Sequence, residues 1–225
     1  MRTVQGSYIL AALITAVIFG AGMLLGMLIE SRRVDLMSSL GREQRLELAS
    51  LQLQYQFISE LGEERNCDAL AKAFESHMIE LAKAQERLES YTKNTKLERA
   101  RFNDIKREYT QAQLATWLLA KKVRSTCGFD IISVLYFYAP ECAACEDQAF
   151  VLSYLKTLLK EKLLVFSLDS ALETEPMIEM LRKSYRVTDY PSLVIEGKLL
   201  VGLRDKAALA AELCPNYAQP NELCS

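Results

Sequence analysis

The sequence predicts a C-terminal α/β domain preceded by a transmembrane helix and a long α-helical or coiled-coil region. Residues 8–29 contain no charged side chain, residues 31–126 contain no proline, and residues 131–213 alternate short apolar runs with helical segments. These patterns are typical of an anchor, a helical stalk and an α/β domain, in that order. We therefore divide the chain into an anchor (1–30), a coiled-coil or hairpin stalk (31–126), an α/β domain (127–213) and a tail (214–225).

The apolar run Tyr8–Ile29 is long enough to cross the roughly 30 Å hydrocarbon core of a bilayer as a helix. A cleaved signal peptide is the alternative, but its apolar core usually spans only about 7–15 residues. The run also leads directly into Glu30-Ser31-Arg32-Arg33, without a small-residue cleavage site. We predict a retained, single-pass membrane anchor.

Two patterns disagree about the orientation of this anchor. Arg2 precedes the run, and Arg32, Arg33, Arg42 and Arg45 follow it closely, which favours a cytoplasmic C-terminal part. The six cysteines are an even set with a close pair near the tail, which favours an oxidising compartment. We expect the extracytoplasmic face. The formal net charge of -2 gives no basic surface for nucleic acid.

Apolar residues recur at helical spacing through the stalk, with charged residues between them. The stripes comprise Leu48, Leu51, Tyr55 and Ile58; then Phe74, His77, Leu81, Ala84 and Leu88; and, after a polar break at residues 92–95, Phe102, Ile105, Tyr109, Ala112 and Leu119. An apolar stripe must be covered, so the stalk folds back on itself, forms a homodimer or packs on the C-terminal domain.

Two features of the stalk invite a further role. His77 is the only histidine, but no Cys, Asp or Glu at ligand-like spacing completes a metal set around it, so we interpret it as a packed core residue. Cys67 and Cys127 bracket the predicted hairpin. A turn centred on Lys93 leaves a mismatch of about 12 Å between them, against a Cα limit near 7 Å for a disulfide. We expect that bridge only if the second helix ends early and the chain doubles back.

The α/β domain has seven predicted elements in the order β-α-β-α-β-β-α, with the first two strands parallel. The strands are 131–138, 163–168, 192–195 and 198–201, and the helices are 142–160, 176–185 and 205–213. Pro176 suits the first turn of its helix, and Asp205 suits the N-cap of the last. In the first helix we expect Phe150, Leu152, Leu155 and Leu159 to be buried.

Two segments carry a family resemblance. Phe137-Tyr138-Ala139-Pro140-Glu141-Cys142-Ala143-Ala144-Cys145 resembles the strand-to-helix active-site segment of thioredoxin-fold proteins, and Val187-Thr188-Asp189-Tyr190-Pro191-Ser192 resembles their second signature. The resemblance spans residues 131–213. It implies an α/β thioredoxin-like domain, a cis-proline at Pro191 facing the dithiol, and thiol–disulfide exchange with protein disulfides or dithiols. It implies no cofactor-binding or metal-binding residue.

The chemistry of a CxxC at a helix start agrees with this resemblance. Cys142 would lie at the helix N-terminus, where unpaired amides and the helix dipole favour the thiolate. Cys145 would lie one turn further in and be more protected. We therefore assign Cys142 as the nucleophile that forms a mixed disulfide, and Cys145 as the residue that resolves it.

The chain departs from the family pattern at three places. Glu141 stands where thioredoxins usually carry tryptophan, and its negative charge opposes thiolate formation at Cys142. Tyr136 occupies the strand position where thioredoxin has a buried acid. The first strand and helix of the full fold are not evident, and the helix ending near Arg124 is a candidate to cover that side of the sheet. A specialised, tethered redox protein fits these differences better than a general cytosolic reductase.

Other interpretations of the cysteines remain open at this stage. CxxC can be half of a zinc site, but the only cysteines beyond it, Cys214 and Cys224, are ten positions apart with two prolines between them. We interpret that pair as a structural disulfide that pins the tail. The alternative function is a non-catalytic, membrane-anchored coiled-coil scaffold with a thioredoxin-fold adaptor domain.

Overall fold

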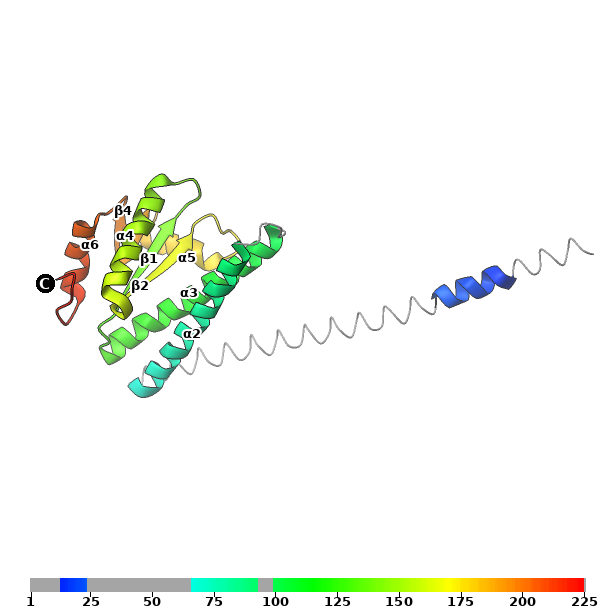
Figure 1. Ribbon diagram of the computed structural model, residues 1–225, viewed down its shortest axis with the longest axis horizontal. Coiled ribbons are helices and arrows are strands. Elements are labelled where there is room, and N and C mark those ends of the chain that lie inside the picture. Colours follow the sequence, from blue (N-terminus) through cyan, green and yellow to red (C-terminus); the bar gives the residue numbers. More distant parts are fainter. Residues whose placement is uncertain (1–12, 24–65, 93–98, 225) are drawn as a thin grey trace, which may run out of the picture. The chain divides into compact units, whose positions relative to one another are not determined.

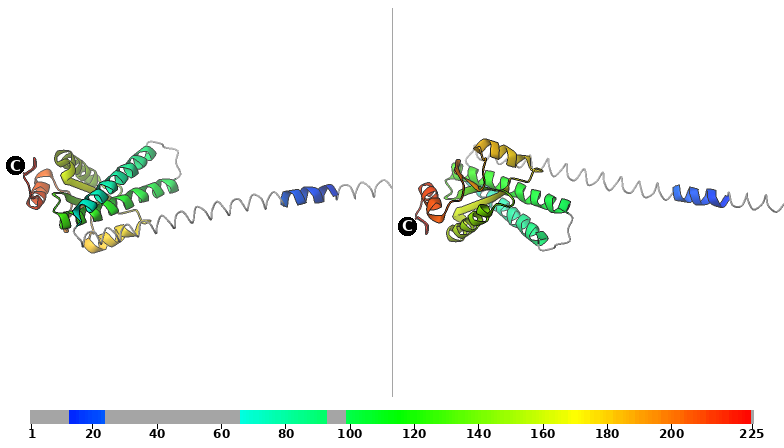
Figure 2. Two further views of the ribbon diagram at one scale, coloured as in Figure 1. Left: turned by 90° about the horizontal axis from the view of Figure 1, so that it is seen from below. Right: turned by 90° about the horizontal axis from the view of Figure 1, so that it is seen from above.

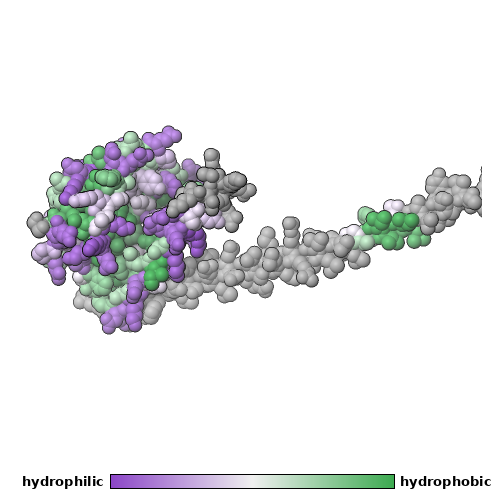
Figure 3. Space-filling view, in the orientation of Figure 1, coloured by the Kyte–Doolittle hydropathy of each residue, from purple (hydrophilic) through white to green (hydrophobic). Residues whose placement is uncertain are grey.

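The computed structural model describes residues 13–23, 66–92 and 99–224 (Figure 1). The chain divides into two compact units, residues 1–57 and 58–225, which are described separately. In the first unit, residues 13–23 are helical and present an apolar surface, with Phe19 73% exposed (Figure 3). Within the described ranges, no helix combines the length and the apolar character needed to cross a bilayer. The predicted span Tyr8–Ile29 extends beyond this described helix at both ends.

The second unit contains a four-stranded sheet with the order β2-β1-β3-β4. Its strands are β1 (Ile132–Tyr138), β2 (Leu163–Asp169), β3 (Ser192–Ile195) and β4 (Lys198–Val201). β1 and β2 are parallel, and β3 and β4 form an antiparallel hairpin that pairs with β1. Two parallel strands joined by a helix and followed by such a hairpin confirm the predicted thioredoxin-like α/β fold.

Helices cover both faces of this sheet. They are α4 (Ala143–Leu159), α5 (Pro176–Tyr185) and α6 (Lys206–Leu213), with short 3-10 turns at Lys160–Lys162 and Cys214–Asn216. α4 and α6 pack on one face of the sheet, and α5 packs on the other (Figure 2). Every element therefore follows the predicted order.

The helix starts confirm the predicted positions of Pro176 and Asp205 and show two further caps, Glu175 and Cys142. Pro176 occupies the first turn of α5, and Glu175 caps that helix by accepting a hydrogen bond from the Met177 amide. Asp205 caps α6 by accepting a 2.8 Å hydrogen bond from the Ala208 amide. α4 is capped by Cys142 itself. Each cap pairs an otherwise unpaired amide of the first turn and so fixes where its helix begins.

Helices α2 (Cys67–Thr92) and α3 (Arg99–Cys127) pack against each other and on the sheet. α3 buries Leu114, Trp117 and Ala120 against β1 and β2, on the same face as α5. This helix thus covers part of that face of the sheet, as expected of the helix ending near Arg124. The stretch containing Leu48 to Ile58 lies outside the described residues. Between residues 67 and 127, the apolar stripes are covered by folding back and by packing on the sheet. His77 is half-buried there, and burial lowers its pKa.

Gln113 of α3 occupies the outer edge of β2, where no other strand of the described residues pairs. Its side chain is 1% exposed, and its amide donates to the Ser167 carbonyl at 3.1 Å while its oxygen accepts from the Ser167 amide at 2.7 Å. This one side chain therefore satisfies the outward-facing backbone groups of Ser167. Buried backbone groups at a strand edge need such partners, because an unpaired one is costly.

The structure corrects our expectation for Cys67 and Cys127, which form a disulfide with a Cα separation of 5.6 Å. The expectation placed the turn at Lys93, whereas α2 ends at Thr92 and α3 begins only at Arg99. The two helices are 26 and 29 residues long, a difference of three residues, or about 4.5 Å of helix. The second helix therefore does not need to end early for the bridge to form.

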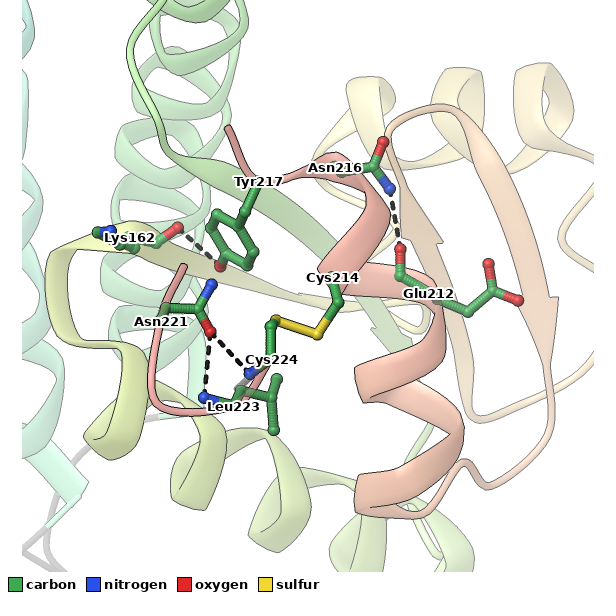
Figure 4. Close-up of a disulfide and its surroundings, with 8 residues drawn as sticks. All are labelled: Lys162, Glu212, Cys214, Asn216, Tyr217, Asn221, Leu223 and Cys224. Carbon is green, nitrogen blue, oxygen red and sulfur yellow. Dashed lines mark hydrogen bonds between the residues drawn. A yellow bond between two sulfur atoms is a disulfide. The ribbon is translucent and has the colours of Figure 1, made fainter. Parts of the chain in front are cut away.

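Cys214 and Cys224 are also joined, with a Cα separation of 5.5 Å (Figure 4). The Asn221 side chain accepts hydrogen bonds from the Leu223 and Cys224 amides, which shapes the tail turn. Tyr217 donates from its hydroxyl to the Lys162 carbonyl at 3.1 Å. The tail is thus fastened to the start of β2, at the end of the sheet opposite the carboxyl end of β1.

One burial prediction is wrong. Phe150 is 77% exposed, whereas Leu152, Leu155 and Leu159 are buried as expected. The buried face of α4 begins at Cys145 and Gln148 and continues through these leucines. Phe150 lies two residues before Leu152, about 200° away around the helix, so it points to solvent.

Candidate active site

The two cysteines of the CxxC follow the carboxyl end of β1 and form a disulfide. Their Cα atoms are 5.2 Å apart. Cys142 is half-buried, and Cys145 is 4% exposed within the core between α4 and the sheet. The first sulfur is therefore the one that a partner reaches more readily, and the second is protected.

Cys142 is the N-cap of α4. Its sulfur accepts a 3.2 Å hydrogen bond from the Cys145 amide, and its carbonyl accepts from the amides of Cys145 and Glu146. A sulfur in this position faces the unpaired amides and the positive end of the helix dipole. Once the disulfide is reduced, these groups favour the thiolate of Cys142 over its thiol.

Glu141 precedes this cap and has a φ of 57°, in the left-handed region that favours glycine. The side chain is exposed. Its carboxylate lies one residue before Cys142 and opposes the stabilisation of a thiolate there, although solvent screens exposed charges. The site therefore combines a helix terminus that favours the thiolate with an acidic neighbour that disfavours it.

Pro191 lies at the same end of the sheet as the dithiol, next to the carboxyl end of β1. The Tyr190–Pro191 peptide bond is cis. Phe137 in β1 pairs with Ser192 in β3, so Pro191 lies beside the end of β1, from which the chain continues to Cys142. Tyr190 and Cys142 both pack against the core cluster that contains Cys145. The structure thus brings the three predicted site residues, Cys142, Cys145 and Pro191, to one end of the sheet.

Tyrosines lie beneath and beside the dithiol. The hydroxyl of Tyr136 donates a 2.5 Å hydrogen bond to the Cys145 carbonyl, and its ring centroid is 5.7 Å from that of Tyr138. Burial raises the pKa of Tyr136 to about 12. Burial, with a smaller contribution from the Asp169 carboxylate, raises the pKa of Tyr138 to about 12 as well. Both hydroxyls are therefore neutral at physiological pH.

A buried ion pair joins α3 to the sheet at this same end. The Lys106 ammonium contacts the Asp169 carboxylate, whose side chain is 8% exposed. The other Asp169 oxygen accepts a 2.9 Å hydrogen bond from the Ala171 amide. Asp169 ends β2, and the next residue, Ser170, donates from its amide to the Tyr138 carbonyl. The ion pair thereby joins α3 to the end of the sheet that carries the dithiol.

Gln148 is a residue that sequence reasoning missed. It is fully buried in α4, one turn after Cys145, and its side chain makes two hydrogen bonds to the backbone of Arg204. Arg204 belongs to the connection between β4 and α6, in which the Gly202 amide donates to the Pro191 carbonyl at 2.8 Å. A glutamine on a helix carries no sequence signal for such a contact, although its position on the buried face of α4 could have drawn attention to it.

The six cysteines form three disulfides, and none is free. Cys127 lies five residues before β1, and Cys214 follows α6 near the start of β2, so both of these bridges lie away from the carboxyl end of β1. Only the Cys142–Cys145 bridge lies at a helix N-terminus beside a cis-proline. This arrangement can exchange a disulfide with a dithiol through a mixed disulfide at Cys142.

Comparisons with known proteins give distant matches. No protein-family model matches the chain, and no curated protein matches it. Among solved structures, the chain is similar to a chloroplastic thioredoxin z, at 17% identity over 43% of this chain and 88% of that one, with a TM-score of 0.34. It is also similar to the oxidised thioredoxin of Plasmodium falciparum, at 17% identity over 39% and 82% of the two chains, with a TM-score of 0.32.

A thioredoxin of Malassezia sympodialis matches at 17% identity over 43% of this chain and 84% of that one, with a TM-score of 0.32. Likenesses this distant do not identify an activity. The thioredoxin-like character of the domain rests on its own strand order and on the CxxC that follows β1.

Proposed function

We propose that this protein is a membrane-tethered thiol–disulfide oxidoreductase that acts on other proteins. The observation that supports this proposal best is the position of the Cys142–Cys145 disulfide. It lies at the N-terminus of α4 and at the same end of the sheet as the cis-proline Pro191. A structural disulfide gains nothing from that position, whereas a reactive one gains a stabilised thiolate.

The exchange proceeds in two steps. In the oxidising direction, a substrate thiolate attacks the Cys142 sulfur, forms a mixed disulfide, and releases Cys145 as a thiolate that takes up a proton. A second substrate thiolate then attacks the substrate sulfur and releases Cys142, so the substrate loses two electrons and the CxxC gains them. In the reducing direction Cys142 attacks a substrate disulfide, and Cys145 resolves the mixed disulfide.

Turnover of a protein disulfide tests this proposal. The full-length chain in detergent, supplied with dithiothreitol, should reduce insulin, and Cys142→Ser should abolish that activity. The matched control is the double variant Cys214→Ser/Cys224→Ser, which removes a disulfide at the other end of the sheet and should retain most of the rate. Equal rates with and without Cys142 would contradict the proposal.

Trapping identifies the partner and separates the enzyme from an adaptor. Cys145→Ser leaves the mixed disulfide unresolved, so a substrate protein should stay covalently attached to Cys142 until a reductant is added. An adaptor would instead bind its partner without turnover, and Cys142→Ser would leave that binding unchanged.

The same proposal includes the anchor and its orientation. The exposed apolar helix at residues 13–23 and the uncharged run around it support a single-pass membrane segment. The pairing of Cys67–Cys127 and Cys214–Cys224 supports an extracytoplasmic domain, because such bridges persist in oxidising compartments. Alkylation of freshly quenched cells should find these four cysteines blocked, and finding them free would contradict the orientation.

A further inference from the structure

Gln148 connects the helix that carries the dithiol to the segment between β4 and α6. Its side-chain oxygen accepts a 2.7 Å hydrogen bond from the Arg204 amide, and its side-chain nitrogen donates to the Arg204 carbonyl at 3.3 Å. The residue is 0% exposed, so neither bond competes with water. A buried amide with both groups engaged fixes the two segments relative to each other.

The held segment continues to the cis-proline. The Gly202 amide donates a 2.8 Å hydrogen bond to the Pro191 carbonyl, and Ser192 pairs with Val201 across the β3–β4 ladder. The Arg204 guanidinium donates to the Val201 carbonyl at 3.0 Å, which closes the segment on itself. A series of contacts thus runs from the dithiol to the proline: Cys145 and Gln148 share α4, Gln148 binds Arg204, and Gly202 binds Pro191.

The same segment exposes apolar side chains next to the proline. Val201 is 40% exposed and Leu203 is 48% exposed, on either side of Gly202. Apolar side chains this exposed, in a segment hydrogen-bonded to the cis-proline, offer contact to a polypeptide bound at this end of the sheet, since burial of apolar surface favours association. A small disulfide compound reaches Cys142 without needing these contacts.

We propose that Gln148 is a positioning residue for protein substrates. By holding Arg204, it keeps the 201–204 segment beside Pro191, so that this segment and the dithiol present one surface to an extended polypeptide with apolar residues near its cysteine. The proposal rests on the oxidoreductase function proposed above. It assigns Gln148 a role in binding the substrate polypeptide and none in the sulfur chemistry.

The chain supplies a matched control in Gln113. This residue is also a buried glutamine whose side chain makes two hydrogen bonds to one backbone residue, Ser167. It holds β2, at one end of the strand order, whereas the segment held by Gln148 follows β4 at the other end. Loss of either amide removes the side-chain partners of one backbone N–H and one backbone carbonyl in a half-buried residue, so the two substitutions have similar structural costs.

The test compares steady-state insulin reduction by the full-length wild type, Gln148→Leu and Gln113→Leu, with dithiothreitol as donor. Gln148→Leu should raise KM for insulin by about fivefold to tenfold with kcat within about twofold, since the lost hydrogen bonds affect binding of the polypeptide. Its rate with the small substrate hydroxyethyl disulfide should stay within about twofold of wild type. Gln113→Leu should leave KM within about twofold.

Gln148→Met also lacks both hydrogen-bonding groups; if Gln148→Leu does not fold, this variant carries the test. An unchanged KM in Gln148→Leu or Gln148→Met would overturn the role of Gln148, and so would an equal rise in Gln113→Leu or an equal loss with hydroxyethyl disulfide. If the wild type itself reduces no insulin, the proposed function fails first, and this role fails with it.

Discussion

The hydroxyl of Tyr136 donates a hydrogen bond to the carbonyl oxygen of Cys145 at 2.5 Å, so β1 holds the first turn of α4 from beneath. Tyr136 is 3% exposed and packs in the same core cluster as Cys145. The protected member of the dithiol is therefore fixed by a neutral hydroxyl group, at a strand position where thioredoxin carries an acid.

Removing this hydroxyl should destabilise the oxidised protein. Tyr136→Phe deletes one buried hydrogen bond and little volume, so we expect the free energy of unfolding to fall by about 1 kcal/mol. Chemical denaturation under non-reducing conditions measures it. The control is Tyr154→Phe, whose side chain is 48% exposed and whose hydroxyl lies 3.4 Å from Lys206; that variant should change stability by less than about 0.5 kcal/mol. Equal effects would show that the Cys145 contact contributes nothing.

Stability should fall between pH 10 and pH 12. Burial raises the pKa values of Tyr136 and Tyr138 to about 12, from an unfolded value of 10.0. Below pH 10 the folded and the unfolded protein both keep the phenol protons of Tyr136 and Tyr138, so the stabilisation is fully present there. As the pH rises from 10 towards 12 the unfolded chain loses its protons first, and the stabilisation is lost. The decline should be shallower in Tyr136→Phe, and parallel curves over this window would contradict the assignment.

The Lys106–Asp169 pair should be worth more than an exposed pair. Lys106→Met leaves a carboxylate that is 8% exposed without its cation, and we expect unfolding to become easier by about 1–3 kcal/mol. Adding Asp169→Asn should recover part of that loss, which a double-mutant cycle measures. Arg87 and Glu108, each 51% exposed, provide the comparison, and Arg87→Met should cost less than about 0.5 kcal/mol. Strict additivity of the Lys106 and Asp169 substitutions would rule out the coupling.

The two bridges away from the dithiol should differ in strength. Cys67–Cys127 spans 60 positions and Cys214–Cys224 spans 10. In the chain-entropy description, their loss costs about 4 and about 3 kcal/mol respectively. Paired Cys→Ser variants should therefore lower the unfolding midpoint more for the first bridge. The reverse order would show that native contacts, and not chain entropy, dominate.

Local signals in the sequence predicted most of the α/β domain. Pro176 and Asp205 marked helix starts because their backbone and capping chemistry suit those positions. The hairpin around Glu196 and Gly197 followed from turn chemistry between two apolar runs. The CxxC after β1 and the proline before β3 indicated the position of the candidate site. Because β1 and β3 are antiparallel neighbours, the end of β1 lies beside the start of β3.

Other features depended on tertiary contacts that no local pattern records. The Cys67–Cys127 bridge depended on where the two helices end, and helix boundaries are poorly specified by sequence. Gln113 and Gln148 resemble surface residues in the sequence, and only the backbone groups beside them explain why they are buried. Phe150 was mispredicted because its apolar character was considered without its direction around the helix.

The Cys67–Cys127 bridge also has a consequence for the integrity of the chain. Cleavage of any one peptide bond between these two cysteines leaves both fragments covalently attached, because the sulfur link encloses the whole α2–α3 stretch. A protein nicked there would migrate as a single species until a reductant was added. Separating residues 1–66 from the α/β domain therefore requires a cut outside this stretch, or a cut within it together with reduction of the bridge.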